Sequence, residues 1–501
     1  MLATALSASI VGVDGVPVRV EVDVAFGLPG LTIVGLAGSA VLEARERVRA
    51  ALRNSGFEVP SRRITINLAP ADLPKEGTGH DLAMATGILV ASDQLDRSLL
   101  ARTALIGELA LDGSLRPVPG VMALVAAAQA AGARDVIVPA ESAAEAAAIT
   151  GIHVRAARAF RQVTRHLAGV DELDIVGPPR RASVVARDDA PDLGSVVGQV
   201  VARRTLEIAV AGRHNLALTG PPGVGKTLLA GAAAGLLPLL DDREAAEVSR
   251  IRSVAGLGAM EGGLDLRRPF RAPHHTISTQ ALVGGGPRIR PGEASLAHRG
   301  ALLLDETLQF RSDALDALRG PIDAGRVTIA RVEGVLSLPA QFMLLATYNP
   351  CPCGWFAVDG HECTCEDGMR RRYQARLSGP MRDRLDMIVV LEPLSSVRRL
   401  TTSESTSAVS PRVARAAAMQ AERQGVPNAE LPPGQMDDRA GFGAVLRSHL
   451  DARGRQMGLS MRRLHRAARV ARTIADLEGV IVVRPEHLDE ALIHRPKEAR
   501  T

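Results

Sequence analysis

The sequence is poor in aromatic residues and in cysteine. Aromatic residues make up only 2% of the 501 residues, with a single tryptophan, and there are four cysteines. Proteins that bind single-stranded nucleic acid by base stacking need several aromatic side chains, so no stacking platform is expected. If this chain binds nucleic acid, the sugar-phosphate backbone is the expected target.

Long apolar runs are absent as well. A membrane-spanning helix needs about 18 or more consecutive apolar residues, and no stretch of the sequence has them. Residues 1–11 lack the basic region with which a signal peptide begins. We therefore expect a cytoplasmic protein without a membrane span. The net charge of +5 identifies no partner by itself.

The most informative motif is a glycine-rich run between an apolar stretch, 215–219, and an alanine- and leucine-rich segment, 228–237. In a strand-loop-helix of this pattern, backbone N–H groups and the helix dipole face the phosphates of a nucleotide. The lysine reaches the β/γ oxygens and the threonine hydroxyl holds Mg²⁺. The run comprises Gly220, Pro221, Pro222, Gly223, Val224, Gly225, Lys226 and Thr227.

A second apolar run, 301–304, ends in the carboxylates Asp305 and Glu306. Asp305 can hold the hydration shell of Mg²⁺, while Glu306 can polarise the attacking water, and hydrolysis of a phosphoanhydride needs both roles. The two motifs together predict an ATPase that uses ATP and Mg²⁺.

All four cysteines lie in one short segment, as Cys351, Cys353, Cys363 and Cys365. Such clustering in a cytosolic chain favours a metal over disulfides, and four thiolates would complete a tetrahedral Zn²⁺ site. The C-x-C spacing is tighter than the common C-x-x-C, so reduced thiols without metal remain the alternative. His361 would be a substitute ligand.

Composition divides the chain into parts. At 501 residues it exceeds one typical core and predicts two or three domains. Residues 1–170 alternate β-like runs with alanine-rich helices, and 171–193 is a polar, proline-bearing linker. Residues 194–394 hold the nucleotide motifs, and 395–501 is mostly helical. The predicted fold class is α/β.

Besides the phosphate loop and the Asp305-Glu306 pair, the nucleotide domain contains the strings Val197-Gly198-Gln199, the run 268–276 and Asn349-Pro350-Cys351-Pro352-Cys353-Gly354. With them the chain resembles the magnesium-chelatase-like AAA+ ATPases of the YifB/ComM type over nearly its whole length. The resemblance implies an AAA+ P-loop core with a helical C-terminal lid, a pore insert (256–299) and a cysteine-rich insert (351–365). It adds Val197, Gln199 and Leu228 to the nucleotide site.

The resemblance also implies three catalytic roles. Asn349 corresponds to the sensor that contacts the γ-phosphate or its attacking water, and Arg462 to the second sensor on the lid. Arg384 corresponds to the arginine finger, with Arg382 as the runner-up. Because such a guanidinium acts on the phosphoryl group bound by a neighbouring subunit, a homo-oligomeric ring is implied, most simply a hexamer.

The N-terminal part resembles the proteolytic domain of Lon, an α+β domain of the ribosomal S5 domain 2 type. The position of the Lon serine nucleophile falls on Gly79, and that of its activating lysine falls on Met122. Glycine offers no nucleophile and methionine no base, so we expect a domain without proteolytic activity.

Three classes of function follow. The ComM-type resemblance implies a hexameric motor on single-stranded or branched DNA, acting as a helicase or in branch migration during homologous recombination and natural transformation. The alternative is a magnesium-chelatase-type remodelling ATPase that does not act on DNA. The third class, an ATP-dependent protease, is disfavoured by Gly79 and Met122.

Arginines in two regions are candidate contacts for a DNA backbone; the alternative is that they are solvated or, in the first region, bind neighbouring subunits. The first region is the pore insert with the following hairpin-like segment, and the second is the arginine-rich stretch 453–472. The candidates in the first region are Arg288, Arg290, Arg326 and Arg331, and those in the second are Arg453, Arg455, Arg463, Arg466, Arg469 and Arg472.

Overall fold

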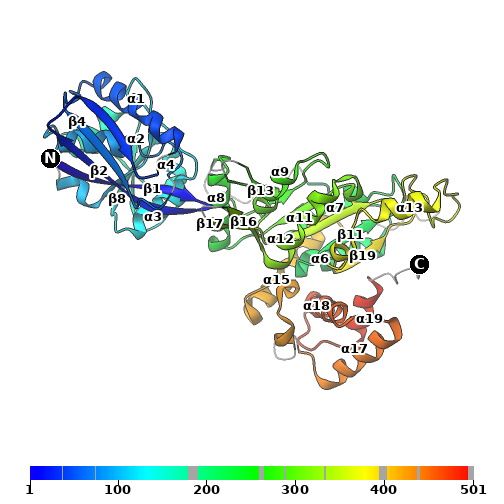
Figure 1. Cartoon of the computed structure of the whole chain (residues 1–501). Helices are drawn as coiled ribbons and strands as arrows, with labels where there is room; N and C mark the ends of the chain where they lie inside the picture. Colours follow the sequence, from blue (N-terminus) through cyan, green and yellow to red (C-terminus); the bar gives the residue numbers. More distant parts are fainter. Residues whose placement is uncertain are drawn as a thin grey trace. The chain divides into compact units, whose positions relative to one another are not determined.

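The computed structural model describes residues 1–36, 38–73, 75–96, 98–178, 190–258, 264–286, 289–331, 334–393, 403–436 and 441–494. Arg288, residues 179–189 of the predicted linker, residues 259–263 of the predicted pore insert and residues 395–402 lie outside these ranges. The chain forms two compact units, each with sheet and helices (Figure 1). The first comprises Met1–Ser183 and Asp242–Asp265, and the second Val184–Asp241 and Leu266–Thr501.

The first unit is built on a mixed eight-stranded sheet in the order β10-β9-β8-β5-β1-β2-β4-β3. Antiparallel pairing joins β1, β2 and β4, whereas β1, β5, β8 and β9 run parallel. The strands are β1 (Leu2–Val11), β2 (Asp14–Ala25), β3 (Gly30–Val34), β4 (Arg63–Ala69), β5 (Thr103–Leu105), β8 (Asp135–Pro139), β9 (His153–Ala157) and β10 (Ile175–Val176), with a separate hairpin of β6 (Glu108–Leu109) and β7 (Leu115–Arg116).

Helices cover this sheet. Every residue of α2 (Asp81–Ala91) is buried, because the helix is apolar on all sides and lies between β1, β2 and α1 (Ser39–Asn54). The other helices of the first unit are η1 (Ser98–Arg102), α3 (Val121–Ala130), α4 (Ala140–Ala146), α5 (Phe160–Leu167) and α8 (Asp242–Val254).

Helix α8 reaches the first unit from a distant part of the sequence. It packs on α3, where the Ser253 carbonyl accepts a hydrogen bond from the Gly120 N–H at 2.9 Å. Arg250 pairs with Asp14 at 3.1 Å. The chain leaves the second unit after residue 241 and returns to it at Leu266. The two ends of this segment lie side by side, because the Leu240 N–H donates to the Leu266 carbonyl at 2.7 Å. This division into two compact units stands next to the domain boundaries expected from the sequence, which remain a prediction.

The second unit has a five-stranded parallel sheet in the order β12-β15-β18-β11-β19. Its inner strands are apolar on both faces, as in a sheet covered by helices on both sides. The carboxyl ends of parallel strands meet at one edge, and three of the predicted motifs follow such ends. The strands are β11 (Leu216–Thr219), β12 (Phe270–Arg271), β15 (Ala301–Leu304), β18 (Met343–Tyr348) and β19 (Met387–Val390).

Short hairpins and helices surround this sheet. The hairpins are β13 (Gly284–Gly285) with β14 (Arg290–Pro291) and β16 (Arg326–Arg331) with β17 (Gly334–Pro339). The helices before the C-terminal region are η2 (Leu193–Ser195), α6 (Val200–Gly212), α7 (Lys226–Leu236), α9 (Thr279–Val283), α10 (Glu293–Leu296), η3 (Thr307–Gln309), α11 (Ser312–Ala317), α12 (Arg319–Ala324), α13 (Asp367–Gln374) and α14 (Gly379–Arg382). Among the described residues, no helix is long and apolar enough to span a bilayer.

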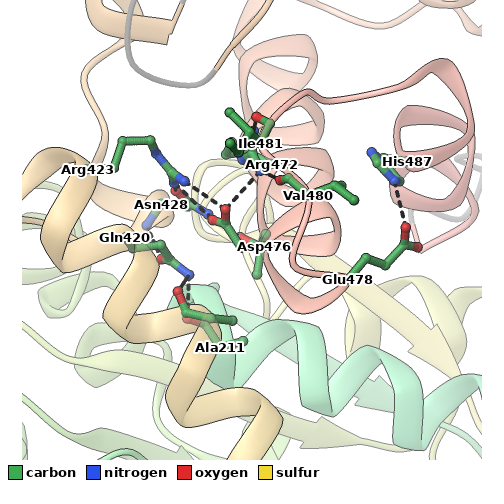
Figure 2. Close-up of polar contacts among 12 residues, drawn as sticks. Ala211, Gln420, Arg423, Asn428, Arg472, Asp476, Glu478, Val480, Ile481 and His487 are labelled. Atoms are coloured by element: carbon green, nitrogen blue, oxygen red, sulfur yellow. Dashed lines mark hydrogen bonds and ion pairs between the residues drawn. The ribbon is translucent and has the colours of Figure 1, made fainter.

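The C-terminal region is helical, and a buried ion-pair network holds it together. Figure 2 shows Asp476 between two arginines, Arg423 at 2.7 Å and Arg472 at 2.9 Å. Asn428 donates a further hydrogen bond to Asp476 at 2.8 Å, so the carboxylate is fully surrounded by donors. The elements are α15 (Thr406–Gln424), η4 (Asn428–Glu430), η5 (Pro433–Gln435), α17 (Ala444–Met457), α18 (Met461–Leu477) and α19 (Pro485–Ile493).

This network corrects one expectation from the sequence. Arg472 was a candidate for a DNA path or a solvated helix face, but it is only 1% exposed and donates to the carbonyls of Val480 and Ile481. Its role is therefore to fix the turn between α18 and α19 (Figure 2). Spacing along the helix does not distinguish it from Arg462, whose side chain is 58% exposed.

Candidate functional site

The phosphate-binding motif lies where predicted, between β11 and the first residue of α7, Lys226. Gly220 has no room for a side chain, because a Cβ there would lie 2.5 Å from the Leu391 carbonyl oxygen. Gly225, which precedes the helix, has φ of 91°, a conformation that L residues with side chains rarely adopt. The sequence therefore shapes a tight loop at the N-terminus of α7.

Lys226 is held inside this loop. Its Nζ donates to the carbonyls of Gly220 at 2.8 Å and Pro221 at 2.7 Å, and to Asn349 Oδ1 at 2.9 Å. Burial lowers the pKa of Lys226, while the nearby carboxylates of Asp305 and Glu306 act in the opposite direction. The structure thus brings the predicted lysine, sensor asparagine and acidic pair to one place.

Asp305 is fixed from two sides. It accepts hydrogen bonds from the Thr227 hydroxyl at 3.0 and 3.2 Å and from the hydroxyl of Thr347. Oxygen donors of this kind suit Mg²⁺, which prefers hard ligands. Thr347 was missed by the sequence argument, although a polar residue at the end of the apolar run of β18 was a usable signal.

Glu306 has an unusual backbone. Its φ is 52°, in the left-handed region that few residues other than glycine adopt, and its N–H donates to the Thr347 hydroxyl at 3.0 Å. Strain of this type persists where the surrounding structure enforces it, and it is concentrated at functional sites. Thr347 therefore positions both acidic residues.

Of the three further residues predicted for the nucleotide site, Gln199 is linked to the loop and Leu228 follows it on α7. Gln199, just before α6, donates to the Glu392 carbonyl at 2.7 Å, and Glu392 follows the Leu391 carbonyl that closes on Gly220. Val197 and Leu228 are 41% and 38% exposed, so both offer apolar surface.

The two predicted catalytic arginines form a separate group around Asp323. Arg384 pairs with Asp323 and donates to the carbonyls of Arg319 and Pro380. Arg462, 58% exposed at the start of α18, lies 3.9 Å from the same carboxylate. The structure therefore brings Arg384 and Arg462 together, with contacts to α12 and α14 rather than to Lys226.

The four cysteines form a compact cluster. The sulfur of Cys351 lies 3.3 Å from that of Cys353 and 3.7 Å from that of Cys363, and Cys353 and Cys363 are 3.6 Å apart. All four Sγ atoms lie within 4.8 Å of one another, so the group could hold a metal ion. His361 instead stacks on Trp355, with ring centroids 3.9 Å apart.

In the first unit, the positions that correspond to the Lon dyad are enclosed. Met122 is 2% exposed on α3, and Gly79 lies in the buried turn before α2. The adjacent His80 is 1% exposed, and its Nδ1 lies 3.0 Å from the Ser7 hydroxyl. Burial lowers the pKa of His80 to about 4, helped by the charge of Lys75. The imidazole of His80 is therefore neutral and buried, and it contributes to the packing of the first unit.

Comparison with known proteins adds family information to this geometry. A family described as magnesium chelatase, subunit ChlI, matches residues 192–398, a second described as subunit ChlI of Mg-chelatase matches 20–142, and the ChlI C-terminal family matches 403–495. The chain is 42% identical to the YifB protein of Salmonella typhimurium over 502 residues, which cover 99% of this chain and 97% of that protein. It is 41% identical to competence protein ComM of Haemophilus influenzae over 503 residues, with coverages of 99% and 97%.

The chain belongs to the YifB/ComM family. Membership in this magnesium-chelatase-like family indicates an ATPase that uses ATP and Mg²⁺. A shorter similarity links this YifB/ComM chain to Lon protease 2 of Bacillus subtilis, at 33% identity over 135 residues, or 27% of this chain and 23% of that protein.

Proposed function

We propose that this chain is an AAA+ motor that hydrolyses ATP and acts on DNA. The observation that carries the ATPase part is the convergence of Lys226, Asn349, Thr227 and Asp305 at one sheet edge. Lys226 would bind the β- and γ-phosphates in place of its present carbonyl partners, and Glu306 would orient the attacking water. Asn349, already bonded to Lys226, would sense the γ-phosphate.

Mg²⁺ would be held by the Thr227 hydroxyl and the Asp305 carboxylate, whose oxygens lie 3.0 Å apart. When bound, the ion would neutralise charge on the β- and γ-phosphate oxygens. Val197, Gln199 and Leu228 would contact the remainder of the nucleotide. For the cysteine cluster, we propose a structural Zn²⁺ ion, because four thiolates are its preferred closed ligand set.

The proposal includes a hexameric ring. Arg384 would act as the finger on a neighbour's nucleotide, and Arg462 as the second sensor. In the single chain both guanidinium groups gather at Asp323, which would hold them near a subunit boundary until a triphosphate competes for them. Arg384→Ala should therefore lower turnover without changing nucleotide affinity.

DNA is the proposed polymer because one relative is named a competence protein, and competence is the uptake of DNA. We propose helicase or branch-migration activity in homologous recombination and natural transformation. Arg290 and Arg326 are exposed, so their side chains are accessible to the phosphates of a DNA backbone. The enclosed positions Gly79 and Met122 support a first unit without peptidase activity.

An ATPase assay titrated with single-stranded, forked and four-way DNA tests this proposal. We expect turnover to rise with DNA and the stimulation to weaken with salt, because backbone contacts release counterions. A chain that hydrolyses ATP with no response to any DNA would favour the second candidate, a magnesium-chelatase-type remodelling ATPase, which the names of the matching families favour. Digestion of casein by the purified protein would contradict an inactive first unit.

A further inference from the structure

The cysteine cluster directly continues the strand that carries the sensor asparagine. β18 ends at Tyr348, Asn349 follows, and only Pro350 separates Asn349 from Cys351. Cys351 is fully buried. A displacement of this thiol would therefore be passed through two peptide units to the side chain that bonds Lys226.

The thiol distances fit one tetrahedral ion. A Zn–S bond of about 2.3 Å places neighbouring sulfurs about 3.8 Å apart. The sulfurs of Cys351, Cys353 and Cys363 are 3.3, 3.6 and 3.7 Å apart and all four sulfurs lie within 4.8 Å of one another, which leaves room for a single ion rather than a multi-iron cluster. The N–H groups of Phe356 and Cys353 point at the sulfurs of Cys351 and Cys365, both at 3.3 Å, which favours thiolate ligands.

This region has little apolar core of its own. Helix α13, which follows the cysteines, has no buried residue, and in the segment 351–366 only Cys351 and Gly354 are buried. A segment without an apolar core needs a cross-link to remain ordered. The four thiols are the one covalent means of cross-linking in the described part of this segment.

The same segment lies against the phosphate loop. A Cβ on Gly354 would be 2.5 Å from Pro222 Cδ, so the backbone of the cysteine loop rests directly on the phosphate loop. On the other side, Gln374 of α13 donates to the Pro350 carbonyl at 3.0 Å, and Arg370 donates to the Cys365 carbonyl at 3.2 Å. The cluster thus joins α13, the sensor and the phosphate loop.

We propose that one zinc ion, bound by Cys351, Cys353, Cys363 and Cys365, positions the nucleotide site by fixing Asn349 and Pro222. The inference rests on the proposed ATPase function and deepens it. Zinc here takes no part in the chemistry. Its loss would release Asn349 from Lys226 and loosen the phosphate loop, which raises the KM for ATP and lowers kcat.

The first experiment removes the ion through a ligand remote from the nucleotide. Full-length wild type should contain a single equivalent of zinc, and Cys363→Ser should lose it and show a KM for ATP that is raised about 10-fold. Cys363→His keeps a zinc ligand and should restore both properties, whereas Thr364→Ser, in the same loop, should change neither. Trp355, the only tryptophan, stacks on His361 within the cluster loop, so its fluorescence reports metal release without any activity assay.

The second experiment tests the contact with the phosphate loop. Gly354 and Gly360 have similar φ values, 87° and 78°, but a Cβ on Gly360 would meet nothing within 4 Å. Gly354→Ala and Gly360→Ala therefore carry the same backbone strain, and only the first pushes on Pro222. We expect both to retain zinc and only Gly354→Ala to raise the KM for ATP.

The outcomes separate this inference from the proposed function. Zinc loss in Cys363→Ser with an unchanged KM, or a wild type purified from zinc-supplemented cells without zinc, would overturn the inference. If the zinc-loaded wild type hydrolysed no ATP, the proposed function would fail, and the affinity for a fluorescent ATP analogue would replace KM in the same comparison. Equal affinities with and without zinc would then overturn the positioning role.

Discussion

The chain has only three lysines, and two of them belong to comparable groups of residues, one group in each unit. In the first unit, Lys75, His80 and Asp81 precede or begin α2, and each is at most 1% exposed. In the second unit, Lys226 begins α7 beside Thr227, half-buried and next to Asp305. Both combine a lysine, a helix N-terminus and a carboxylate.

The difference lies in what could replace the present partners. Lys75 donates to the Pro70 carbonyl and Asp81 is bound by Arg47 at 2.7 and 3.1 Å, and both Lys75 and Asp81 are almost completely buried. Burial raises the pKa of Asp81 to about 6 in spite of Arg47. Lys226 instead is half-buried and bonds carbonyls of a loop whose residues Pro222 and Gly223 are exposed, where phosphate oxygens can take over. The exposure of the lysine, more than the types of residue around it, distinguishes the group that serves packing from the group proposed for catalysis.

The largest expected effect is on catalysis in the second unit. Lys226→Ala should reduce ATP turnover about 10³-fold, as the loss of a positioned charge at a reacting phosphate does. The unfolding midpoint should hardly change, because the lysine is only half-buried. Steady-state phosphate release and urea unfolding measure the two quantities. Residual turnover within a few-fold of the wild type would place the chemistry elsewhere.

The reverse pattern is expected in the first unit. Asp81→Ala leaves the largely buried Arg47 without its carboxylate, which should lower the free energy of unfolding by about 3–5 kcal/mol. Turnover per folded molecule should stay at the wild-type level. Glu46→Ala is the matched control, since its pair with Arg45 is exposed and should contribute only about 0–1 kcal/mol. Equal losses in the two variants would contradict the comparison.

The sealed imidazole predicts a pH dependence of stability. The folded-state pKa of His80 is about 4, below its ordinary value of 6.5, so the unfolded chain takes up the proton first and stability falls as the pH drops from 6.5 to 4. The full contribution is on the order of 3 kcal/mol. Asp81 acts in the opposite direction between about pH 6 and 3.8, because its folded-state pKa is raised.

His80→Gln removes only the first contribution. As the pH falls through this window, the unfolding free energy of the wild type should therefore decrease relative to that of the variant. Urea titrations at several pH values measure it. A difference that does not vary with pH would mean that the imidazole titrates normally.

The smallest expected effect is at Thr347. Thr347→Val removes the hydroxyl that binds Asp305 and accepts the Glu306 N–H, so the Mg²⁺ concentration needed for half-maximal turnover should rise about 10-fold. Thr347→Ser keeps the hydroxyl and is the control. If valine and serine behaved alike, the hydroxyl would have no part in positioning the acidic pair.

Much of the candidate site was predictable because its residues stand in short motifs. The loop 220–227 and the pair Asp305-Glu306 each follow an apolar strand, and parallel strands place their ends at one edge. The burial of Arg472 and the partnership of Arg384 with Asp323 were not predicted, and the support from Thr347 was missed although its polar side chain at the end of an apolar run was a usable signal. The contacts of Arg384 with Asp323 and of Thr347 with Asp305 join segments far apart in the sequence. Arg472 bonds to residues four to nine positions away, and the spacing of the arginines alone does not reveal that it is buried.

The excursion of α8 into the first unit has a practical consequence for dissecting the protein. A fragment that starts near residue 190 would retain α8 with Ala245, Val248 and Ile251 stripped of their cover, and a fragment that stops near residue 170 would lack the helix that caps α3. Either piece would be prone to aggregate for reasons unrelated to activity. A clean excision would splice residue 240 to residue 266, whose backbone atoms already touch, and supply the missing helix to the other half as a separate peptide.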